Sequence, residues 1–558
     1  MSTLTAPFGK LRTADRAQTG IADLLAVSVI VVISAALVSL FLVEARRLIG
    51  GFGVPLDDAW IHYRIAENLA NGLGFSYNVG QPTSASTSPA WTALLAVAYR
   101  FTGQFLLPSI LLGAFFYLAS NLAVYRIALV IKPNRWVALA AAVFTAVAGR
   151  WVWAAASGME TTLFTALVLW GILLLYAPRA SRSGIAQWSG AALLCLASLV
   201  RPEAYLLLAL AIGFALITTV METYPRSVPA LITGFIGRSG LILVIALVAA
   251  IALRLGYTLG TSGSLLGNTF LAQSLPQGNS PYTGPRLIPD FYYLRSVVQS
   301  LRSDMFLLGL LIPVGIIQTI RLLRTRESAR PLGIMLVLWF VALPLFNSVI
   351  SPNLRHHERY IMPLIPLAAM FGVFGIDLIV EFLAGAGQRI RIAPLRLAIP
   401  ATAVFLLLAT ICLGDALFDT RRWAAQYAGD ARNIQAINVQ LGEWLRDNTP
   451  PDAYIAMNDI GATTFISKRR ILDTVGIAEP ELLPVLVRQG RAGVLGYLEM
   501  KRPDYLVIWP EWYPELAARS DLFTPVHSVT VDSPSGTIRS SMLGGNEMVV
   551  YRTNWPQP

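Results

Sequence analysis

Two adjacent carboxylates open the segment DDAWIHYRIAENLANG, which follows the first long apolar run of the chain. Helical spacing would put Asp58 and His62 one turn apart on one face, with Asp57 and Arg64 two turns apart on an adjoining face. A carboxylate beside such groups can take a proton from a hydroxyl group, as a general base does. The alternative is a capped interfacial helix, with an Asp at its start and Gly72 at its end, whose charges face water.

Three further ionisable residues stand at the ends of predicted membrane spans: Glu160 in SGMETT, and Arg201 and Glu203 in RPEAY. A carboxylate at a helix N-terminus is favourable by about 0.3–1 kcal/mol, so capping alone would explain Glu160 and Glu203. Ionisable residues that converge on one membrane face are more often functional, because each is costly to bury unless it pairs or faces a watery cavity. All three are therefore candidate site residues.

A basic cluster precedes a late apolar run, in SPNLRHHERYIMPLIP. Its position runs against the positive-inside trend, so membrane topology does not explain it. Guanidinium groups bind phosphate oxygens bidentately, which makes the cluster a good receptor for a phosphate. The alternative is a solvated juxtamembrane cluster. Its charged and imidazole residues are Arg355, His356, His357, Glu358 and Arg359.

The elements that must position these residues are membrane-spanning helices. The chain has 558 residues, of which 55% are hydrophobic and only 13% charged, and its mean hydropathy is +0.59. This composition excludes an ordinary soluble protein. Runs of about 20 apolar residues match the hydrocarbon thickness of a bilayer. We predict about eleven spans, at 22–43, 105–131, 136–156, 160–177, 186–200, 203–221, 234–256, 304–323, 332–350, 360–383 and 395–416.

The net charge of +11 indicates an orientation in the membrane. The basic residues are scattered over short loops and form no stripe, so we expect no nucleic-acid partner. With a cytoplasmic N-terminus, the basic loops alternate onto the cytoplasmic side, and the acidic and basic motifs above lie on the extracytoplasmic face. The loop residues are Lys132, Arg135, Arg179, Arg182, Arg226, Arg321, Arg324, Arg326, Arg330, Arg389, Arg391 and Arg396.

Several connecting segments are predicted within a membrane domain that spans residues 21–418. Residues 1–20 are expected to be a loose cytoplasmic tail, 44–104 the first extracytoplasmic loop, and 257–303 a long loop of the kind that often serves as a lid. Residues 88–101 read as an interfacial helix, because a span there would invert every later loop. Cys195 and Cys412 lie in apolar runs as small hydrophobic residues, which leaves no disulfide framework.

The composition changes after the last span, and residues 419–558 are predicted to form an extracytoplasmic α/β domain. AYIAMND and DYLVIW read as short buried strands, with a helical stretch between them. Asp459 and Asp473 fall at strand ends, where turn and capping roles are the better interpretation.

In this order, the motifs resemble the GT-C superfamily of integral-membrane glycosyltransferases, which use polyprenyl-phosphate sugars. The segment from Asp57 to Trp91 is closest to the first loop of bacterial cell-wall arabinofuranosyltransferases, and SGMETTLF, RPEAYL and RYIMPLIP resemble further signatures. The resemblance implies a multi-pass protein of the plasma (inner) membrane. It also implies that Asp57 is the general base acting on the hydroxyl of a glycan, protein or lipid acceptor.

The predicted reaction is an inverting transfer of a sugar from a polyprenyl-phosphate donor to an extracytoplasmic acceptor. Displacing a lipid phosphate from an anomeric carbon needs a base on the acceptor side and cations on the leaving phosphate. The predicted catalytic residues are Asp57, Asp58 and Glu160. The predicted donor-phosphate ligands are Arg201, Arg355, His356, His357 and Arg359. The predicted substrate-binding residues are His62, Arg64 and Glu203.

No metal-ligand spacing such as HExxH occurs, so no cofactor is predicted, although Asp58 would hold a divalent cation if the enzyme uses one. Two other classes stay open. A flippase or transporter of lipid-linked sugars would need polar residues in mid-span and inverted repeats, and the sequence has few of the former and none of the latter. A non-catalytic carbohydrate-binding protein would leave the acidic and basic motifs without a role.

Overall fold

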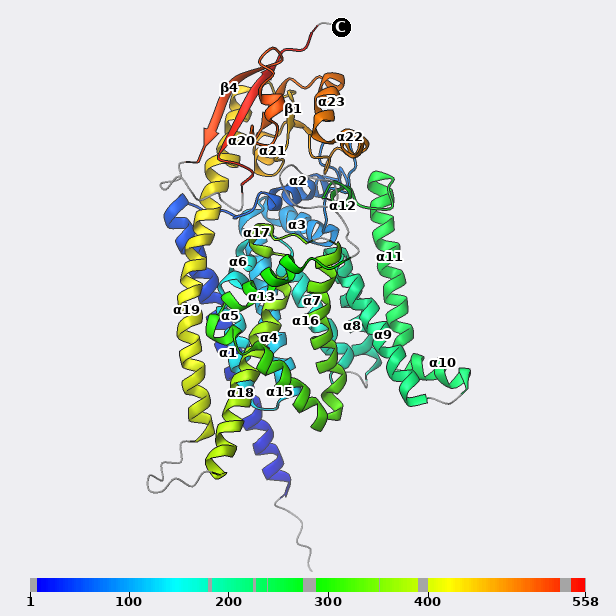
Figure 1. Ribbon diagram of the computed structural model, residues 1–558, viewed down its shortest axis with the longest axis vertical. Coiled ribbons are helices and arrows are strands. Elements are labelled where there is room, and N and C mark those ends of the chain that lie inside the picture. The colour runs from blue at the N-terminus through cyan, green and yellow to red at the C-terminus, as the bar shows by residue number, and fades with distance from the viewer. Residues whose placement is uncertain are drawn as a thin grey trace, which may run out of the picture.

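The computed structural model describes residues 8–178, 183–223, 227–237, 239–273, 288–350, 352–389, 400–531 and 543–556. They form a bundle of apolar helices with a small domain containing a β-sheet at one end (Figure 1). The predicted class, a polytopic α-helical membrane protein with a C-terminal α/β domain, is confirmed.

The longest helices coincide with predicted spans. In the described part of the chain, seven helices are long and apolar enough to cross a membrane, and an eighth span results if the bent pair α5 (Arg135–Val147) and α6 (Gly149–Ala156) is counted as one. The helices at the seven spans are α1 (Phe8–Ile49), α4 (Leu106–Ile131), α9 (Ala204–Thr223), α11 (Gly240–Ser262), α16 (Arg330–Ile350), α18 (Ile365–Arg389) and α19 (Ala401–Ile434).

The other three predicted spans are shorter or interrupted helices. They are α7 (Thr161–Tyr176), α8 (Gly184–Val200), and α14 (Phe306–Gly309) followed by α15 (Ile312–Thr325). With 16 residues in α7 and 17 in α8, each is shorter than a straight span of about 20 residues, so helix length does not establish the count of eleven. The loop residues Arg179, Arg182, Arg226, Arg391 and Arg396 lie outside the described residues.

Two connecting segments are more helical than predicted. Helix α1 begins at Phe8, within the expected tail, and residues 1–7 lie outside the described part. The expected loop at 257–303 begins inside α11 and contains α12 (Asn268–Gln273) and α13 (Phe291–Ser303), while 274–287 lie outside the described part. Helix α13 starts where it does because the Asp290 carboxylate accepts a hydrogen bond from the Tyr293 N–H, which caps the helix.

Two short helices lie across one end of the bundle, between it and the sheet: α2 (Asp58–Ala70) and α3 (Pro89–Thr102) (Figure 1). Helix α3 occupies the segment predicted to be interfacial. Helix α2 ends as predicted before Gly72, whose φ of +79° is a conformation that glycine adopts without penalty. The outer domain therefore lies on this pair of helices.

The outer domain contains one five-stranded sheet in the order β2-β1-β3-β5-β4. Strand β1 pairs in parallel with β2 and β3, and β5 is antiparallel to β3 and β4. Strands β1 and β3 are the two predicted from the sequence. The bounds are β1 (Tyr454–Met457), β2 (Arg470–Asp473), β3 (Tyr505–Ile508), β4 (Phe523–Thr530) and β5 (Glu547–Thr553).

The chain enters the outer domain without a break. Helix α19 leaves the bundle, and a π-helical turn at Gln435–Val439 leads directly into α20 (Gln440–Asn448) (Figure 1). The boundary predicted between residues 418 and 419 therefore falls inside a continuous helix. Asp473 has the predicted turn role, since its carboxylate accepts hydrogen bonds from the backbone N–H groups of Val475 and Ala478.

Candidate active site

Asp58 is the first residue of α2 and lies at the centre of the candidate site. Its Oδ2 is 2.7 Å from a terminal nitrogen of Arg359 and 4.0 Å from Nδ1 of His356. The Asp58 side chain is 34% exposed, whereas that of Arg359 is only 9% exposed. Burial raises the pKa of Asp58, but the positive charge of Arg359 and the neighbouring His356 outweigh it, so the pKa lies below its usual value.

A second set of polar contacts and ion pairs adjoins Asp58, and His62 connects the two sets. His62 Nε2 lies 3.9 Å from Oε2 of Glu160, and Arg201 lies 3.7 Å from Oε1 of the same carboxylate. Arg201 also forms a 2.7 Å ion pair with Glu203. Carboxylates from the starts of α7 and α9 thus meet a guanidinium from the end of α8, which is the convergence that the sequence predicted.

Tyr360 joins the two sets, and the sequence analysis missed it. The Arg201 guanidinium lies 4.8 Å from the centre of the Tyr360 ring, and the Arg359 guanidinium lies 5.3 Å from it. An Arg359 nitrogen also donates a 3.4 Å hydrogen bond to the Tyr360 hydroxyl. The only available signal was an aromatic residue directly after Arg359, at the start of a span. We call the whole group the Asp58 cluster: Asp58, His62, Glu160, Arg201, Glu203, His356, Arg359 and Tyr360.

The Asp58 cluster has hydrogen-bonding capacity to spare. Among the described residues, Nε and one terminal nitrogen of Arg359, and one terminal nitrogen of Arg201, are buried without a hydrogen-bond partner. Buried polar groups are normally paired, and unpaired ones mark places where a ligand or water binds. Because all three of these nitrogens belong to guanidinium groups, they favour an anion with several oxygens.

His62 is held in place from the opposite side. Its Nδ1 lies 2.9 Å from the hydroxyl of Thr92 and 3.3 Å from that of Ser86. Burial lowers the pKa of His62, and the nearby carboxylates Glu160 and Asp58 only partly oppose this effect. The imidazole is therefore neutral at pH 7 and can both donate and accept a hydrogen bond.

The architecture resembles that of two solved membrane enzymes. One is the oligosaccharyltransferase AglB from Archaeoglobus fulgidus in complex with an inhibitory peptide and a dolichol-phosphate, with a TM-score of 0.59 and 13% identity over 92% of this chain and 73% of that chain. The other is ArnT from Cupriavidus metallidurans bound to undecaprenyl phosphate, with a TM-score of 0.57 and 15% identity over 94% of this chain and 98% of that chain. The chain has the GT-C fold.

Sequence comparisons add one further match. Residues 425–551, which cover most of the outer domain, match a family described as a domain of unknown function, DUF8728. No curated protein matches the sequence significantly. The outer domain is therefore similar to a sequence family of unknown function, within a chain that has the GT-C fold.

Asp57, the predicted base, has a different environment from Asp58. Asp57 is only 6% exposed. Its two carboxylate oxygens accept 2.7 Å hydrogen bonds from the backbone N–H groups of Gly461 and Ala462 in the outer domain. Gly461 directly precedes α21 (Ala462–Ser467) and Ala462 is its first residue, so Asp57 caps the start of a helix of the outer domain. Within the described chain it makes no side-chain hydrogen bond to α2, as the predicted cap would.

Three other predicted site residues lie away from the Asp58 cluster. Arg64 donates to the backbone oxygen of Tyr77 and pairs with Glu67 at 3.6 Å. His357 points to the other side of its turn, where Nε2 lies 2.8 Å from Asp430. Arg355 is exposed. The predicted meeting of Arg64 with Asp57 and the predicted contact of His357 with the donor are therefore not supported by the geometry.

A cation at Asp58 has little support from the arrangement of side chains. Among the residues that the structure describes, no group of three or more His, Cys, Asp or Glu side chains is placed to hold a metal ion. The Asp58 carboxylate instead faces the Arg359 guanidinium.

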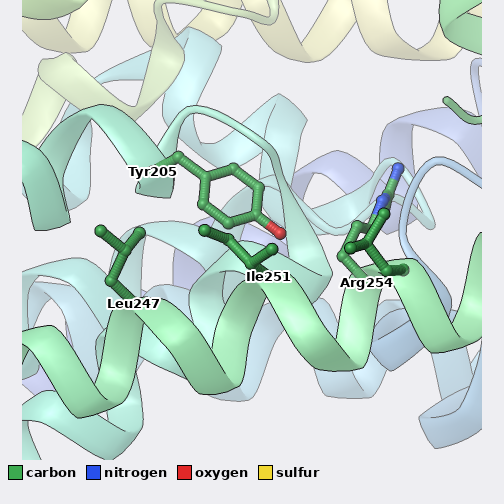
Figure 2. Close-up of a pocket in the computed structure, with 5 residues that line it drawn as sticks. Tyr205, Leu247, Ile251 and Arg254 are labelled. Atoms are coloured by element: carbon green, nitrogen blue, oxygen red, sulfur yellow. The ribbon is translucent and has the colours of Figure 1, made fainter. Parts of the chain in front are cut away.

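The extended segment that leads into α3 is tied to the bundle by α11. Arg254 donates a 3.1 Å hydrogen bond to the backbone oxygen of Thr87. The Tyr257 hydroxyl donates a 3.0 Å hydrogen bond to the backbone oxygen of Ser86. Arg254 also lines a pocket whose other residues are Tyr205 of α9 and Leu247, Ile251 and Leu255 of α11. The Tyr205 ring lies over α11 in this pocket (Figure 2). Because Ser86 contacts His62, these bonds fix one wall of the Asp58 cluster.

Proposed function

We propose that this protein is an inverting glycosyltransferase that moves a sugar from a polyprenyl-phosphate donor to an extracytoplasmic acceptor. One observation carries the proposal: an accessible carboxylate, Asp58, stands beside buried guanidinium groups of Arg359 and Arg201 that have unpaired N–H groups. A base and a phosphate receptor are the two parts that this displacement requires. The GT-C fold agrees with it, because both solved relatives were obtained with a polyprenyl phosphate bound.

In the proposed reaction, Asp58 is the base. Asp58 is more accessible than the buried Asp57, and its ion pair with Arg359 is made through Oδ2. The acceptor hydroxyl gives its proton to the Asp58 carboxylate while its oxygen bonds to the anomeric carbon. The bond from that carbon to the phosphate oxygen breaks, and its electron pair leaves with the phosphate, which inverts the configuration.

The guanidinium groups stabilise the leaving phosphate. Arg359 can hold Asp58 through one terminal nitrogen and still offer Nε and its other terminal nitrogen to phosphate oxygens. Such a bidentate contact strengthens as the phosphate gains charge, which lowers the barrier. Because the leaving group is a stable anion, no strong general acid is needed. Glu160 and Glu203 keep Arg201 oriented toward Tyr360.

The test is direct transfer by the purified protein. Incubation with a panel of polyprenyl-phosphate sugars, starting with an arabinofuranosyl donor because of the resemblance of the first loop, should release free polyprenyl phosphate and yield a product of inverted configuration. A lipid-linked-sugar transporter would instead move the intact donor across proteoliposome membranes without release of polyprenyl phosphate. Absence of release with every donor in the panel, with and without added glycan acceptors, would count against the proposal.

A further inference from the structure

The turn that carries His356 and His357 has an unusual backbone. His356, His357 and Glu358 have φ values of 54°, 55° and 56°, which is the left-handed region. Residues with a Cβ adopt this region only at a cost, and rarely three times in succession. Such a conformation persists only where the surroundings impose it, and it occurs preferentially at functional sites.

Arg150 of α6 imposes the turn from one side. One of its terminal nitrogens donates to the backbone oxygen of His357 at 3.1 Å and to Oε2 of Glu358 at 3.2 Å. Its other terminal nitrogen forms a 2.6 Å ion pair with Asp304. The Arg150 side chain is only 2% exposed, so its position is fixed.

Asp430 of α19 imposes the turn from the other side. Its Oδ2 lies 2.8 Å from Nε2 of His357 and accepts a 3.1 Å hydrogen bond from the Trp153 indole. Gln426 donates to its other oxygen at 2.8 Å. The His357 ring is also packed edge-to-face against Trp153 and Trp423, with ring centres 5.2 Å and 5.0 Å away.

The consequence of the turn is the placement of its neighbours. With His357 directed toward Asp430, the residue before it points to Asp58, and Arg359 directly after the turn reaches both Asp58 and Tyr360. In a right-handed helix successive side chains are spaced about 100° apart in one direction around the axis. The left-handed turn reverses that direction, so His356 and His357 face different neighbours from those that they would face in a right-handed helix.

We propose that Arg150 and Asp430 are positioning residues, which hold the left-handed turn at 356–358 and thereby aim Arg359 at the donor phosphate. This inference rests on the proposed function, since it assigns Arg359 to the donor. A buried ion pair such as that of Arg150 with Asp304 is weak evidence of a stabilising role, because desolvation offsets its attraction. Its position against the strained backbone gives it a more specific role.

The test measures binding of undecaprenyl phosphate, and so does not depend on turnover. Arg150→Met should weaken this binding at least tenfold. Arg150→Met with Glu358→Gly should recover most of the loss, because glycine adopts a φ near 56° without strain. The matched variant Arg150→Met with Glu358→Gln removes the same buried charge without freeing the backbone, and it should stay weak.

The outcomes separate the possibilities. Wild-type affinity in Arg150→Met, or equal recovery by the glutamine and glycine variants, would overturn the inference. If the wild type itself does not bind undecaprenyl phosphate, the proposed function fails first. If Arg150→Met does not fold, Asp430→Asn, which keeps the side-chain shape, carries the test: it should weaken binding severalfold, and unchanged binding would contradict the role of the turn.

Discussion

The Asp57 carboxylate accepts a 2.7 Å hydrogen bond from the backbone N–H of Gly461, which lies 404 residues further along the chain. This bond places the outer domain directly on the loop that carries Asp58. A Cβ at position 461 would overlap the Asp57 carboxylate, so only glycine fits. The outer domain is therefore built into the candidate active site.

Gly461→Ala should loosen the contact between the outer domain and α2. Inserting a methyl group into a closely packed contact typically costs about 1–3 kcal/mol. Hydrogen exchange at α21 should increase, and transfer activity should fall because the neighbouring Asp58 loses its support. Gly496→Ala is the matched control, since a Cβ there meets nothing within 4 Å. Equal behaviour of the two variants would show that the contact has no role.

The carboxyl group of Asp57 also makes the folding stability of the protein dependent on pH. Burial, followed by the neighbouring Asp459, raises the pKa of Asp57 well above its usual value of 3.8. The folded state then holds a proton that the unfolded state has lost, so stability falls as the pH rises from about 4 to the raised pKa. The thermal stability of the wild type relative to Asp57→Asn should therefore decline over that interval. A difference that grows with pH would contradict the direction of the shift.

Arg359→Ala should weaken binding of undecaprenyl phosphate by about 1.5–3 kcal/mol, the usual loss for a hydrogen bond to a charged group. The reason is that two buried nitrogens of Arg359 have no hydrogen-bond partner among the described residues, while the same guanidinium group pairs with Asp58. Arg355→Ala is the matched control, because Arg355 lies in the same turn but is exposed. If both variants bind equally well, the phosphate does not lie at Arg359.

The orientation in the membrane can be tested by labelling. A cysteine at Asn71, an exposed residue at the end of α2, should react with an impermeant thiol reagent added from outside the cell. A cysteine at Arg326, which is exposed between α15 and α16, should react only after the membrane is opened. Cys195 and Cys412 are replaced beforehand. The reverse pattern would invert the predicted topology.

Much of the fold follows from short-range patterns. Apolar runs locate the helices because each run must match the bilayer, and Gly72 ends α2 because of its backbone freedom. The broken helices were not predictable in this way. The bend of 60° between α5 and α6 interrupts one apolar run that reads as a continuous span.

The candidate site was only partly predictable, because its details depend on contacts between distant segments. Composition and spacing indicate that Asp57 and Asp58 matter, but which of them is free depends on Gly461. In the same way, the sequence does not distinguish the roles of His356 and His357. The left-handed turn directs His356 toward Asp58 and His357 toward Asp430. No local pattern encodes that turn, since Arg150 and Asp430 impose it from other helices.

The last prediction distinguishes the two adjacent carboxylates. Asp58→Asn should lower turnover by roughly 100- to 10,000-fold, which is the usual contribution of a general base. Binding of undecaprenyl phosphate should persist, because Arg359 and Arg201 stay in place and the amide can still accept a hydrogen bond from Arg359.

Asp57→Asn should act differently, since its amide keeps one acceptor for Gly461 or Ala462 and loses the other. We therefore expect a smaller loss of turnover together with faster hydrogen exchange at α21. Asp447→Asn controls for the substitution itself, because Asp447 is an exposed partner of Arg446 in the outer domain. Turnover by Asp58→Asn at the level of Asp447→Asn, with Asp57→Asn inactive, would return the base to Asp57 and refute the assignment made here from accessibility.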